Sequence, residues 1–429
     1  MRAERGGPRG PVEAARCRSV IVRKRNWWER IRDRLSDAAL RTSFLFFEYL
    51  LPKRTNAWCF CTWKNAYPHT IDNPRGVFEE VKNDGSIIKI ILLKTSRSPG
   101  LNVTEGKNVH FVPVESIRGA YEIARSKVII LGYGLSGVSS FSRYTTKRHH
   151  VIQLWHGIPL KRIGKLFPGE HFWNAETSKY TATVCSADRD RELMTMAFAP
   201  VPRVWITGLP RNDLIMKPEG DLPSDYRDQL TALRQQIAGR RFILYAPTWR
   251  NEDSGIYPFS NDEWSTLERF LRDHGATMGI RAHANRRSLD GPQAGALASS
   301  IFYVNSYPDV NLVLRLTDIL VTDYSSIYID FLLTGRPILN FTYDLDNYVG
   351  ERGFLYPLED AMPDRPFRTF GELLTRLDTL LSGRELNPIQ YKNSKDLFHG
   401  HSGNSSKAVA ERIMALSALS TAETGLDQR

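Results

Sequence analysis

The stretch that decides the fold is DILVTDYSSIYIDFLLTGRPILNFTY, Asp318–Tyr343. It begins with a short apolar run, Ile319–Thr322, which predicts a buried strand. After a polar cluster, the apolar segment Ile327–Leu333 has the length of a helix, and Ile338–Thr342 predicts a second strand. The order strand, loop, helix, strand is a βαβ unit, which predicts an α/β protein with a parallel sheet.

The polar cluster, Asp323–Ser326, lies at the carboxyl end of the first predicted strand. Ser325 or Ser326 can cap the helix that follows, and a helix N-terminus attracts anions through its free N–H groups. Because ligands of open α/β sheets bind at the carboxyl ends of strands, this loop is a candidate anion site. The alternative is a capped helix in an ordinary α/β core.

The same pattern extends through most of the chain. From residue 57 to about residue 208, short apolar runs alternate with helical ones, which predicts a doubly wound parallel sheet. A second series begins at Phe242–Ala246 and leads into the opening stretch. Between them, KPEGDLPSD (217–225) is polar and predicts a linker, so that a cleft separates two α/β halves.

Polar clusters follow four of the predicted strands: HGIPLK (156–161), PTWR (247–250), RAH (281–283) and DYSS (323–326). If both sheets turn their carboxyl ends toward the cleft, the four clusters converge there. Together they hold two histidines, several cations and hydroxyl groups, which are the groups needed to bind a diphosphate and move a proton. Each residue also has an ordinary alternative, since a histidine after a strand is more often structural and an arginine can form a surface ion pair.

Composition limits the partners. The 429 residues carry a formal net charge of +11, which indicates nucleic acid, anionic lipid or a phosphate-rich substrate. No zinc-finger spacing and no RNP-like motif occurs, so nucleic acid is disfavoured. Four cysteines are too few for a disulfide framework, and no set of ligand type predicts a metal. No apolar run approaches the length that spans a bilayer, and we expect a cytoplasmic protein with reduced thiols.

The N-terminal region differs from the rest. Residues 1–26 form a basic tail that we expect to be disordered, and residues 27–55 predict amphipathic helices. In these helices arginines alternate with apolar residues before a dense aromatic and apolar patch over residues 44–51. A basic helix with such a face suits an anionic membrane surface. The alternative is a helix that packs on the core of the protein.

The clusters also carry a resemblance. LWHGIPLKRIG (154–164), YAPTWR (245–250), RAH (281–283), TDYSSIYIDF (322–331) and FTYDLDNYVGERGF (341–354) resemble the CDP-glycerol glycerophosphotransferase family of teichoic-acid and capsule polymer enzymes. Weaker similarity extends the match to roughly residues 57–415.

The resemblance implies a glycosyltransferase-B-type fold of two Rossmann-like domains. Residues 56–216 would form the acceptor domain, residues 226–400 the nucleotide-donor domain and residues 401–429 a C-terminal helix and tail. The enzyme would transfer the polyol phosphate of CDP-glycerol or CDP-ribitol to a hydroxyl of a lipid-linked or polymeric acceptor and release CMP. It would need no cofactor or metal, and would lie peripherally on the cytoplasmic face of the bacterial cell membrane.

The resemblance also assigns roles. It makes His156 the catalytic base and places His283, Ser325 and Ser326 at the donor phosphates. The other residues expected to bind the donor or its phosphates are Lys161, Thr248, Arg250, Arg281, Asp323, Asp344 and Arg352. Two other functions compete with this one: a nucleotide-sugar glycosyltransferase of the same fold, and a basic membrane- or nucleic-acid-binding protein without catalysis. The convergence of two histidines favours an enzyme.

Overall fold

The computed structural model describes residues 27–61, 72–93, 106–167, 173–248, 259–281, 300–346, 353–384, 388–401 and 403–426. The strands are β1 (Arg54–Cys61), β2 (Ile88–Leu93), β3 (Val109–Pro113), β4 (Ser126–Leu131), β5 (His150–Gln153), β6 (Tyr180–Cys185), β7 (Val204–Ile206), β8 (Arg241–Ala246), β9 (Ala276–Ile280), β10 (Ile301–Tyr303), β11 (Ile319–Thr322) and β12 (Ile338–Asn340). The longer helices are α1 (Trp27–Leu50), α2 (Asp72–Val81), α3 (Ile117–Arg125), α5 (Asp188–Ala197), α7 (Ser224–Ile237), α8 (Asn261–Asp273), α13 (Phe370–Leu381), α14 (Pro388–Phe398) and α15 (Ser405–Leu426). Shorter helices are α4 (Trp173–Thr177), α6 (Asp213–Met216), α9 (Val310–Leu316), α10 (Ile327–Phe331) and α12 (Leu358–Ala361).

The N-terminal half is built on a seven-stranded sheet in the order β3-β2-β1-β4-β5-β6-β7. Every pair in it is parallel, so the predicted doubly wound sheet is confirmed. One interior strand, β1, was not among the predicted strands, and its first two residues lie inside the predicted helical segment 27–55. The first residues of β1, Arg54–Asn56, are polar and do not resemble a buried strand. The last five residues of β1 are nevertheless all buried.

The C-terminal half holds a five-stranded parallel sheet in the order β10-β9-β8-β11-β12. The stretch Asp318–Tyr343 forms β11 and β12, the last two strands of this sheet. Leu320 pairs with Ile338, so the predicted βαβ unit is confirmed. Its helix is shorter than expected. After α10 the chain continues as a 3-10 turn, Leu332–Thr334, which ends at Gly335 in the left-handed conformation that glycine adopts without strain.

The predicted linker, residues 217–225, is more structured than its composition indicated. It contains a 3-10 turn, Glu219–Asp221, and the first residues of α7. Leu222 and Tyr226 are buried there, in a small cluster with Leu230. A polar sequence rich in proline therefore packs at the junction of the halves because a few apolar side chains anchor it.

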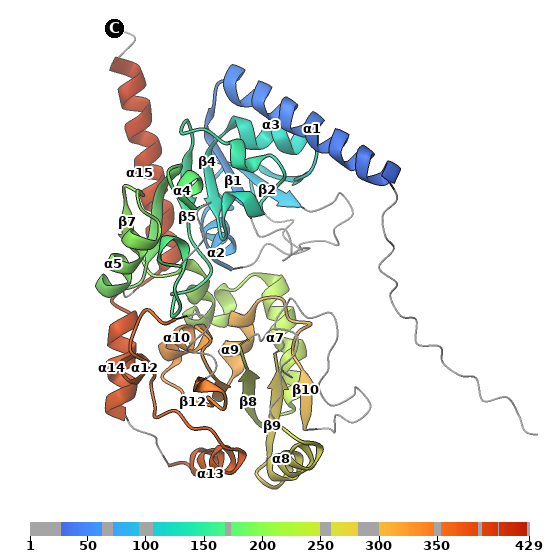
Figure 1. The fold of residues 1–429 in the computed structure, drawn as a ribbon, viewed down its shortest axis with the longest axis vertical. Coiled ribbons are helices and arrows are strands. Elements are labelled where there is room, and N and C mark those ends of the chain that lie inside the picture. The colour runs from blue at the N-terminus through green and yellow to red at the C-terminus, as the bar shows by residue number, and fades with distance from the viewer. Residues whose placement is uncertain are drawn as a thin grey trace, which may run out of the picture.

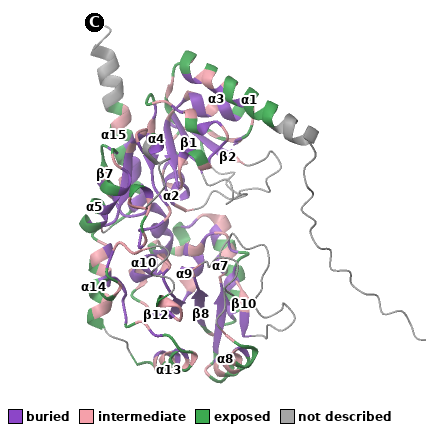
Figure 2. Ribbon diagram, viewed as in Figure 1, coloured by how far each residue is buried: buried purple, intermediate pink, exposed green. Residues whose placement is uncertain are grey.

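Two C-terminal helices join the halves (Figure 1). α14 runs beside the C-terminal half, and α15 continues along the N-terminal half, where it packs on α2. Figure 2 shows that burial is concentrated in the strands and in the faces of the helices that cover them. Each half is thus an α/β arrangement, one hydrophobic cluster contains residues of both halves, and α15 packs the C-terminal part of the chain on α2.

Helix α1 is a single helix held against the N-terminal half. Its residues Leu40 and Phe44 are buried, and the carboxylate of Glu48 is fully buried. Glu48 accepts a hydrogen bond from Lys53 at 2.6 Å and contacts His149 Nε2 at 2.8 Å. Burial by itself would raise the pKa of Glu48, but the bonds and charge of His149 and Lys53 lower it to about 2. The inner face of α1 is therefore part of the fold.

Candidate active site at the strand ends

His156 follows β5 and lies in a tight turn. Its ring stacks on Tyr133, with ring centroids 4.2 Å apart and planes 10° from parallel, and it also contacts Trp155. Trp155 has φ of 55°, which is uncommon for a residue with a large side chain. The ring is therefore sandwiched in a fixed orientation at the carboxyl end of the sheet.

The hydrogen bond of the imidazole defines its tautomer. Nδ1 lies 3.2 Å from the carbonyl oxygen of Gly132. Because a carbonyl only accepts, Nδ1 carries the proton in the neutral ring, and the lone pair is on Nε2. Within the described ranges Nε2 has no hydrogen-bond partner. Burial and the nearby charge of Arg211 lower the pKa of His156 to about 4, so the ring is neutral at pH 7 and can accept a proton.

The turn around His156 is held by two side chains of the N-terminal half. Asn73, at the start of α2, donates to the carbonyls of Leu154 and Trp155 at 3.1 and 3.0 Å. Arg211 donates to the carbonyl of His156 at 2.6 Å. Three consecutive carbonyls that lie beyond the end of β5 are thus satisfied by side chains rather than by a neighbouring strand.

The turn around His156 contacts the loop that holds Ser325 and Ser326. Gly157 has φ of 148°, and a Cβ on it would lie 3.3 Å from Ser326 Oγ and 2.9 Å from Arg211 Nη2. The expected cap is weak: Ser326 makes no side-chain cap bond to α10, and Ser325 Oγ lies 3.5 Å from the N–H of Ile327. The structure therefore brings the turn of His156 and the serine loop together from the two halves, while the convergence of all four clusters stays a prediction.

Asp323 organises the loop before the serines. It is buried, and it accepts hydrogen bonds from the backbone N–H and the hydroxyl of Thr248 at 2.8 and 2.6 Å. These bonds tie the end of β11 to the end of β8. Asp323 and Thr248 therefore meet, and the contacts that they make are those of residues that position a loop.

Lys161 also contacts the end of the motif FTYDLDNYVGERGF (341–354). Residues 160–162 pair with residues 353–355, through a bridge between Lys161 and Phe354 and a 3.0 Å bond from Leu355 N to Leu160 O. Nearby, Asp344 accepts a 3.3 Å hydrogen bond from the hydroxyl of Tyr324. The motif FTYDLDNYVGERGF (341–354) thus contacts both the stretch that carries His156 and the loop that carries Ser326.

Arg281 was expected to bind a donor phosphate, but its guanidinium is engaged by backbone carbonyls. Its guanidinium donates to the carbonyls of Val304, Tyr307 and Pro308 at 3.3, 2.6 and 2.9 Å. Burial lowers the pKa of Arg281 to about 10, which leaves it charged at pH 7. The side chain therefore anchors the loop after β10, and phosphate binding by it stays a prediction. Three further candidates, His283, Arg250 and Arg352, lie outside the described residues.

Arg211 and its neighbours are the part of the site that sequence reasoning missed. Arg211 belongs to GLPRND (208–213), a polar cluster that directly follows β7. The same strand-end pattern that singled out the other clusters applies to it. Its partner Asp330 lies within the quoted motif TDYSSIYIDF (322–331), but there it follows an apolar segment and reads as part of a helix.

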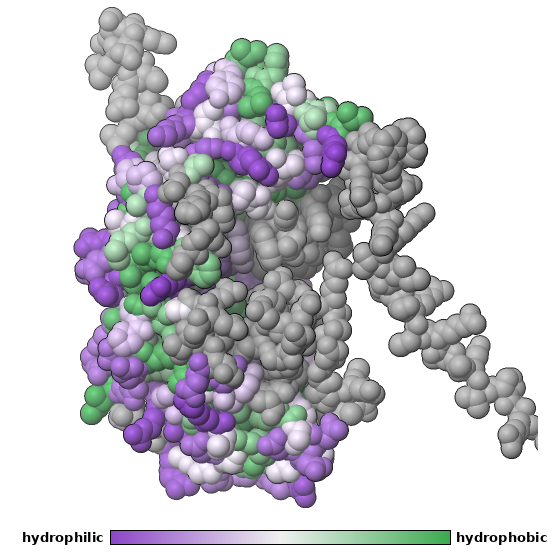
Figure 3. Space-filling view, viewed as in Figure 1, coloured by the Kyte–Doolittle hydropathy of each residue, from purple (hydrophilic) through white to green (hydrophobic). Residues whose placement is uncertain are grey.

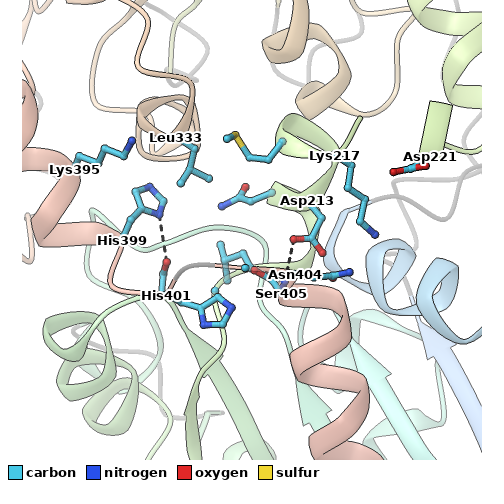
Figure 4. Close-up of a pocket in the computed structure, with 15 residues that line it drawn as sticks. Asp213, Lys217, Asp221, Leu333, Lys395, His399, His401, Asn404 and Ser405 are labelled. Carbon is cyan, nitrogen blue, oxygen red and sulfur yellow. Dashed lines mark hydrogen bonds between the residues drawn. The ribbon is translucent and has the colours of Figure 1, made fainter. Parts of the chain in front are cut away.

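The same turn also fastens the C-terminal helix. Asp213 accepts from the backbone N–H groups of Ser405 and Ser406 at 3.0 and 2.8 Å, at the start of α15. A pocket of about 660 Å³ lies beside this contact, with Lys217, Lys395 and His399 on its walls (Figure 4). Thus residues 211–213 touch His156, α15 and the pocket within one turn of chain.

Among the side chains that the structure describes, no three histidines, cysteines or carboxylates gather as a metal site would require. The same part of the chain contains three cysteines, Cys59, Cys61 and Cys185, all buried and unpaired. Asp323 is engaged by Thr248, and Asp330 by Arg211.

The fold and the convergent strand ends define a class of two-sheet parallel α/β proteins that includes a known enzyme. The structure of the wall teichoic acid polymerase TagF matches with a TM-score of 0.73 and 21% identity, over 91% of this chain and 98% of that chain. At this identity the match establishes the shared fold.

The family follows from the sequence. The model of the CDP-glycerol:poly(glycerophosphate) glycerophosphotransferase family matches residues 43–415, and the chain belongs to this family. The resemblance found in the motifs is thereby confirmed.

Individual relatives agree with this assignment. The chain is 26% identical to the teichoic acid poly(ribitol-phosphate) polymerase of Bacillus spizizenii, over 78% of this chain and 54% of that protein. It is 23% identical to the poly(glycerol phosphate) polymerase of Bacillus subtilis, over 80% and 46% respectively. A teichoic acid glycerol-phosphate primase of Bacillus spizizenii is 26% identical over 79% of this chain and 90% of the primase. The chain spans about half the length of the two polymerases.

Proposed function

We propose that the protein transfers a polyol phosphate from a CDP-activated donor to a hydroxyl group of a lipid-linked or polymeric acceptor. The observation that carries the proposal is the contact of the turn that holds His156, through Gly157, with Ser326, together with an imidazole whose Nε2 has no partner among the described residues. Family membership supports CDP-glycerol as the donor class, and the related TagF polymerase has been studied after soaking with CDPG. The ribitol-phosphate relatives make CDP-ribitol the second donor to test.

The chemistry follows from the state of His156. The oxygen of the acceptor hydroxyl attacks the phosphorus that carries the polyol, and its proton passes to Nε2. The bond between this phosphorus and the oxygen that bridges the two phosphates breaks, so that CMP leaves with the bridging oxygen. His156 then gives up its proton to solvent or to the departing phosphate, because burial and Arg211 disfavour the charged ring.

The negative charge of the diphosphate needs positive groups at the same place. We assign this role to Lys161, His283 and Arg250, with Ser325 and Ser326 as hydroxyl donors and Arg352 and Asp344 at the polyol end. Phosphoryl transfer depends mainly on positioning and on such electrostatic stabilisation. Support comes from Ser326, whose hydroxyl is not used to cap α10 and faces the turn of His156.

The division of the fold suggests where each substrate binds. In this proposal the two halves face each other across a cleft of the glycosyltransferase-B type, with the donor on the C-terminal half. The acceptor then approaches from the N-terminal half, on the side of His156. Contacts between the halves at Gly157 and Ser326, and between Lys161 and Phe354, support this arrangement.

We place the protein on the cytoplasmic face of the cell membrane, held by the outer face of α1. Leu35, Phe46, Tyr49 and Leu50 are all more than half exposed on this helix. Figure 3 shows hydrophobic and hydrophilic residues side by side at the top of the molecule, over α1. In the described residues no helix is long and apolar enough to cross a membrane. An exposed apolar row beside arginines suits the surface of an anionic bilayer.

The experiment that tests the catalytic assignment compares two substitutions in one assay. His156→Ala should slow CMP release from CDP-glycerol by on the order of 10²–10⁴-fold, the usual effect of losing a general base. The affinity for the donor should stay near the native value, whereas His283→Ala should weaken donor binding. His150→Ala, at the opposite end of the same strand, is the matched control. A native rate in His156→Ala would contradict the assignment.

A further inference from the structure

The guanidinium of Arg211 joins the two halves of the molecule at the candidate base. One nitrogen, Nη1, donates to the carbonyl of His156 at 2.6 Å, and the other, Nη2, donates to the carboxylate of Asp330 on α10. The helix α10 begins directly after Ser326. A single rigid side chain therefore spans from the peptide that carries the imidazole to the helix that carries the serine loop.

Arg211 is itself fixed on both sides. Its backbone N–H donates to Asn73 at 3.0 Å, and Asn73 also holds the carbonyls of Leu154 and Trp155. From the other half, the side chain of Asn311 donates to the carbonyl of Arg211 at 2.8 Å. Arg211 is 8% exposed. The turn of His156 thus rests on a buried polar network in which each half supplies partners.

The space for this contact depends on Gly157. A Cβ at that position would lie 2.9 Å from Arg211 Nη2, closer than a side-chain carbon tolerates, and φ of 148° disfavours any residue other than glycine. The chain therefore leaves one position without a side chain, and the guanidinium fills the space between the turn and the serine loop.

Charge gives Arg211 a second effect on His156. The guanidinium is flanked by Asp72, at 3.4 Å, and by Asp330. These carboxylates outweigh the effect of burial and keep the pKa of Arg211 above its usual range, so it is always charged. The positive charge beside the imidazole then adds to burial in lowering the pKa of His156.

From these contacts we infer that Arg211 is the positioning residue of the transfer reaction, which sets the orientation of His156 and ties it to the approach of the donor-binding half. This inference rests on the proposed function, because the reaction in which Arg211 positions His156 is the proposed polyol-phosphate transfer. In the proposed reaction Arg211 touches neither substrate. It acts through the peptide of His156 on one side and through Asp330 and α10 on the other.

Kinetics provide the first arm of the test. Arg211→Gln removes both the charge and the two-sided contact, and should lower kcat for CMP release on the order of 10²-fold with little change in the donor KM. Arg211→Lys keeps the charge but cannot reach both partners, so kcat should stay below the native value. The control is Arg315→Gln, because Arg315 donates to the carbonyls of Leu214, Ile215 and Lys217 without contact to His156.

A titration that needs no substrate provides the second arm. The imidazole of His156 is followed by NMR of ring-labelled protein, with the signal assigned from His156→Gln. The other charged or titratable groups here are Asp72, Asp309, Asp330 and Tyr133, which interact with Arg211, and Tyr133 also stacks on the imidazole; all four stay unchanged in all variants. The pKa of His156, about 4 in the intact protein, should rise in Arg211→Gln but stay below its ordinary value because burial remains, and it should stay at about 4 in Arg211→Lys and Arg315→Gln.

The outcomes separate the two claims. If the intact protein turns over no CDP-polyol, the proposed function fails, while the titration still decides whether Arg211 controls His156. If turnover occurs but Arg211→Gln leaves both kcat and the pKa of His156 unchanged, the inference on Arg211 is overturned. Should Arg211→Gln fail to fold, Arg211→Lys decides, and a native kcat in that variant would contradict the positioning role.

Discussion

Gly157 lies against Ser326 across the junction of the two halves, where a Cβ on the glycine would come within 3.3 Å of the serine hydroxyl. One residue belongs to the turn after β5 and the other to the loop after β11, 169 positions later in the chain. The contact brings the candidate base and the candidate phosphate loop to one place. It also makes the site sensitive to a single methyl group.

Gly157→Ala should therefore damage the site more than an ordinary surface substitution. The new Cβ meets Arg211 and Ser326, and the backbone conformation is unfavourable for alanine, which together should cost about 1–3 kcal/mol of stability. The rate of CMP release should fall at least in proportion to the loss of folded protein. The control is Gly371→Ala, where a Cβ meets nothing within 4 Å and the glycine is in a helix. Thermal denaturation and CMP release check both, and equal behaviour of the two variants would count against the contact.

Asp323 should matter for the shape of the donor site. Asp323→Asn removes one acceptor for the N–H and hydroxyl of Thr248, and should lower the free energy of unfolding by about 1–3 kcal/mol and weaken donor binding. Thr248→Val should have a similar effect, whereas Thr248→Ser keeps the hydroxyl and should stay near native. Urea denaturation and calorimetric titration with CDP-glycerol measure the two effects. Native stability in Asp323→Asn would show that these bonds do not hold the loop.

Helix α1 should separate membrane binding from folding. Phe46→Glu combined with Leu50→Glu changes only exposed positions, and should release the protein from anionic vesicles with an unchanged melting temperature. Glu48→Ala should instead lower stability by about 3–5 kcal/mol, because it leaves Lys53 buried without its carboxylate partner. Vesicle sedimentation at low and high salt measures the membrane binding of both variants, and thermal denaturation measures their stability. Sedimentation of the Phe46 and Leu50 variant like the intact protein would place the membrane contact elsewhere.

Activity should survive removal of divalent ions. The proposal assigns the charge of the phosphates to protein cations and hydroxyl groups, so EDTA should leave the rate of CMP release nearly unchanged. The assay is run after dialysis against EDTA, with magnesium or manganese added back to a parallel sample. Complete loss of activity that either ion restores would show that the positive field of the protein is incomplete by itself.

The βαβ unit and the two parallel sheets could be predicted because buried parallel strands are short apolar runs between helical segments. β1 was missed because its first three residues, Arg54–Asn56, are polar. The helix α7 was missed for a related reason: Pro218 and Pro223 made the segment before it look like an open linker, whereas Leu222 and Tyr226 bury it. Composition describes a segment as a whole, and one or two buried side chains can decide its structure.

For the site, the sequence predicted polar clusters at particular strand ends, and the structure brings His156, Lys161, Asp323 and Ser326 toward one junction, while their chemical roles stay predictions. The sequence could not show that three backbone carbonyls engage Arg281, because that contact depends on the path of the loop after β10. Nor could it find the pair Arg211 and Asp330, which are 119 residues apart and meet only when the halves come together. Contacts between distant segments are set by packing and leave no local pattern.

The most direct test of the central claim is the identity of the nucleotide released. The purified protein is incubated with CDP-glycerol or CDP-ribitol and a lipid-linked polyol-phosphate acceptor, with UDP- and CMP-sugars as parallel donors, and products are analysed by mass spectrometry. Polyol-phosphate transfer breaks the bond between the two phosphates, so we expect CMP and an acceptor heavier by one or more polyol phosphates, with the signal lost in His156→Ala. Turnover of a nucleotide sugar alone, with a sugar added to the acceptor, would contradict the account.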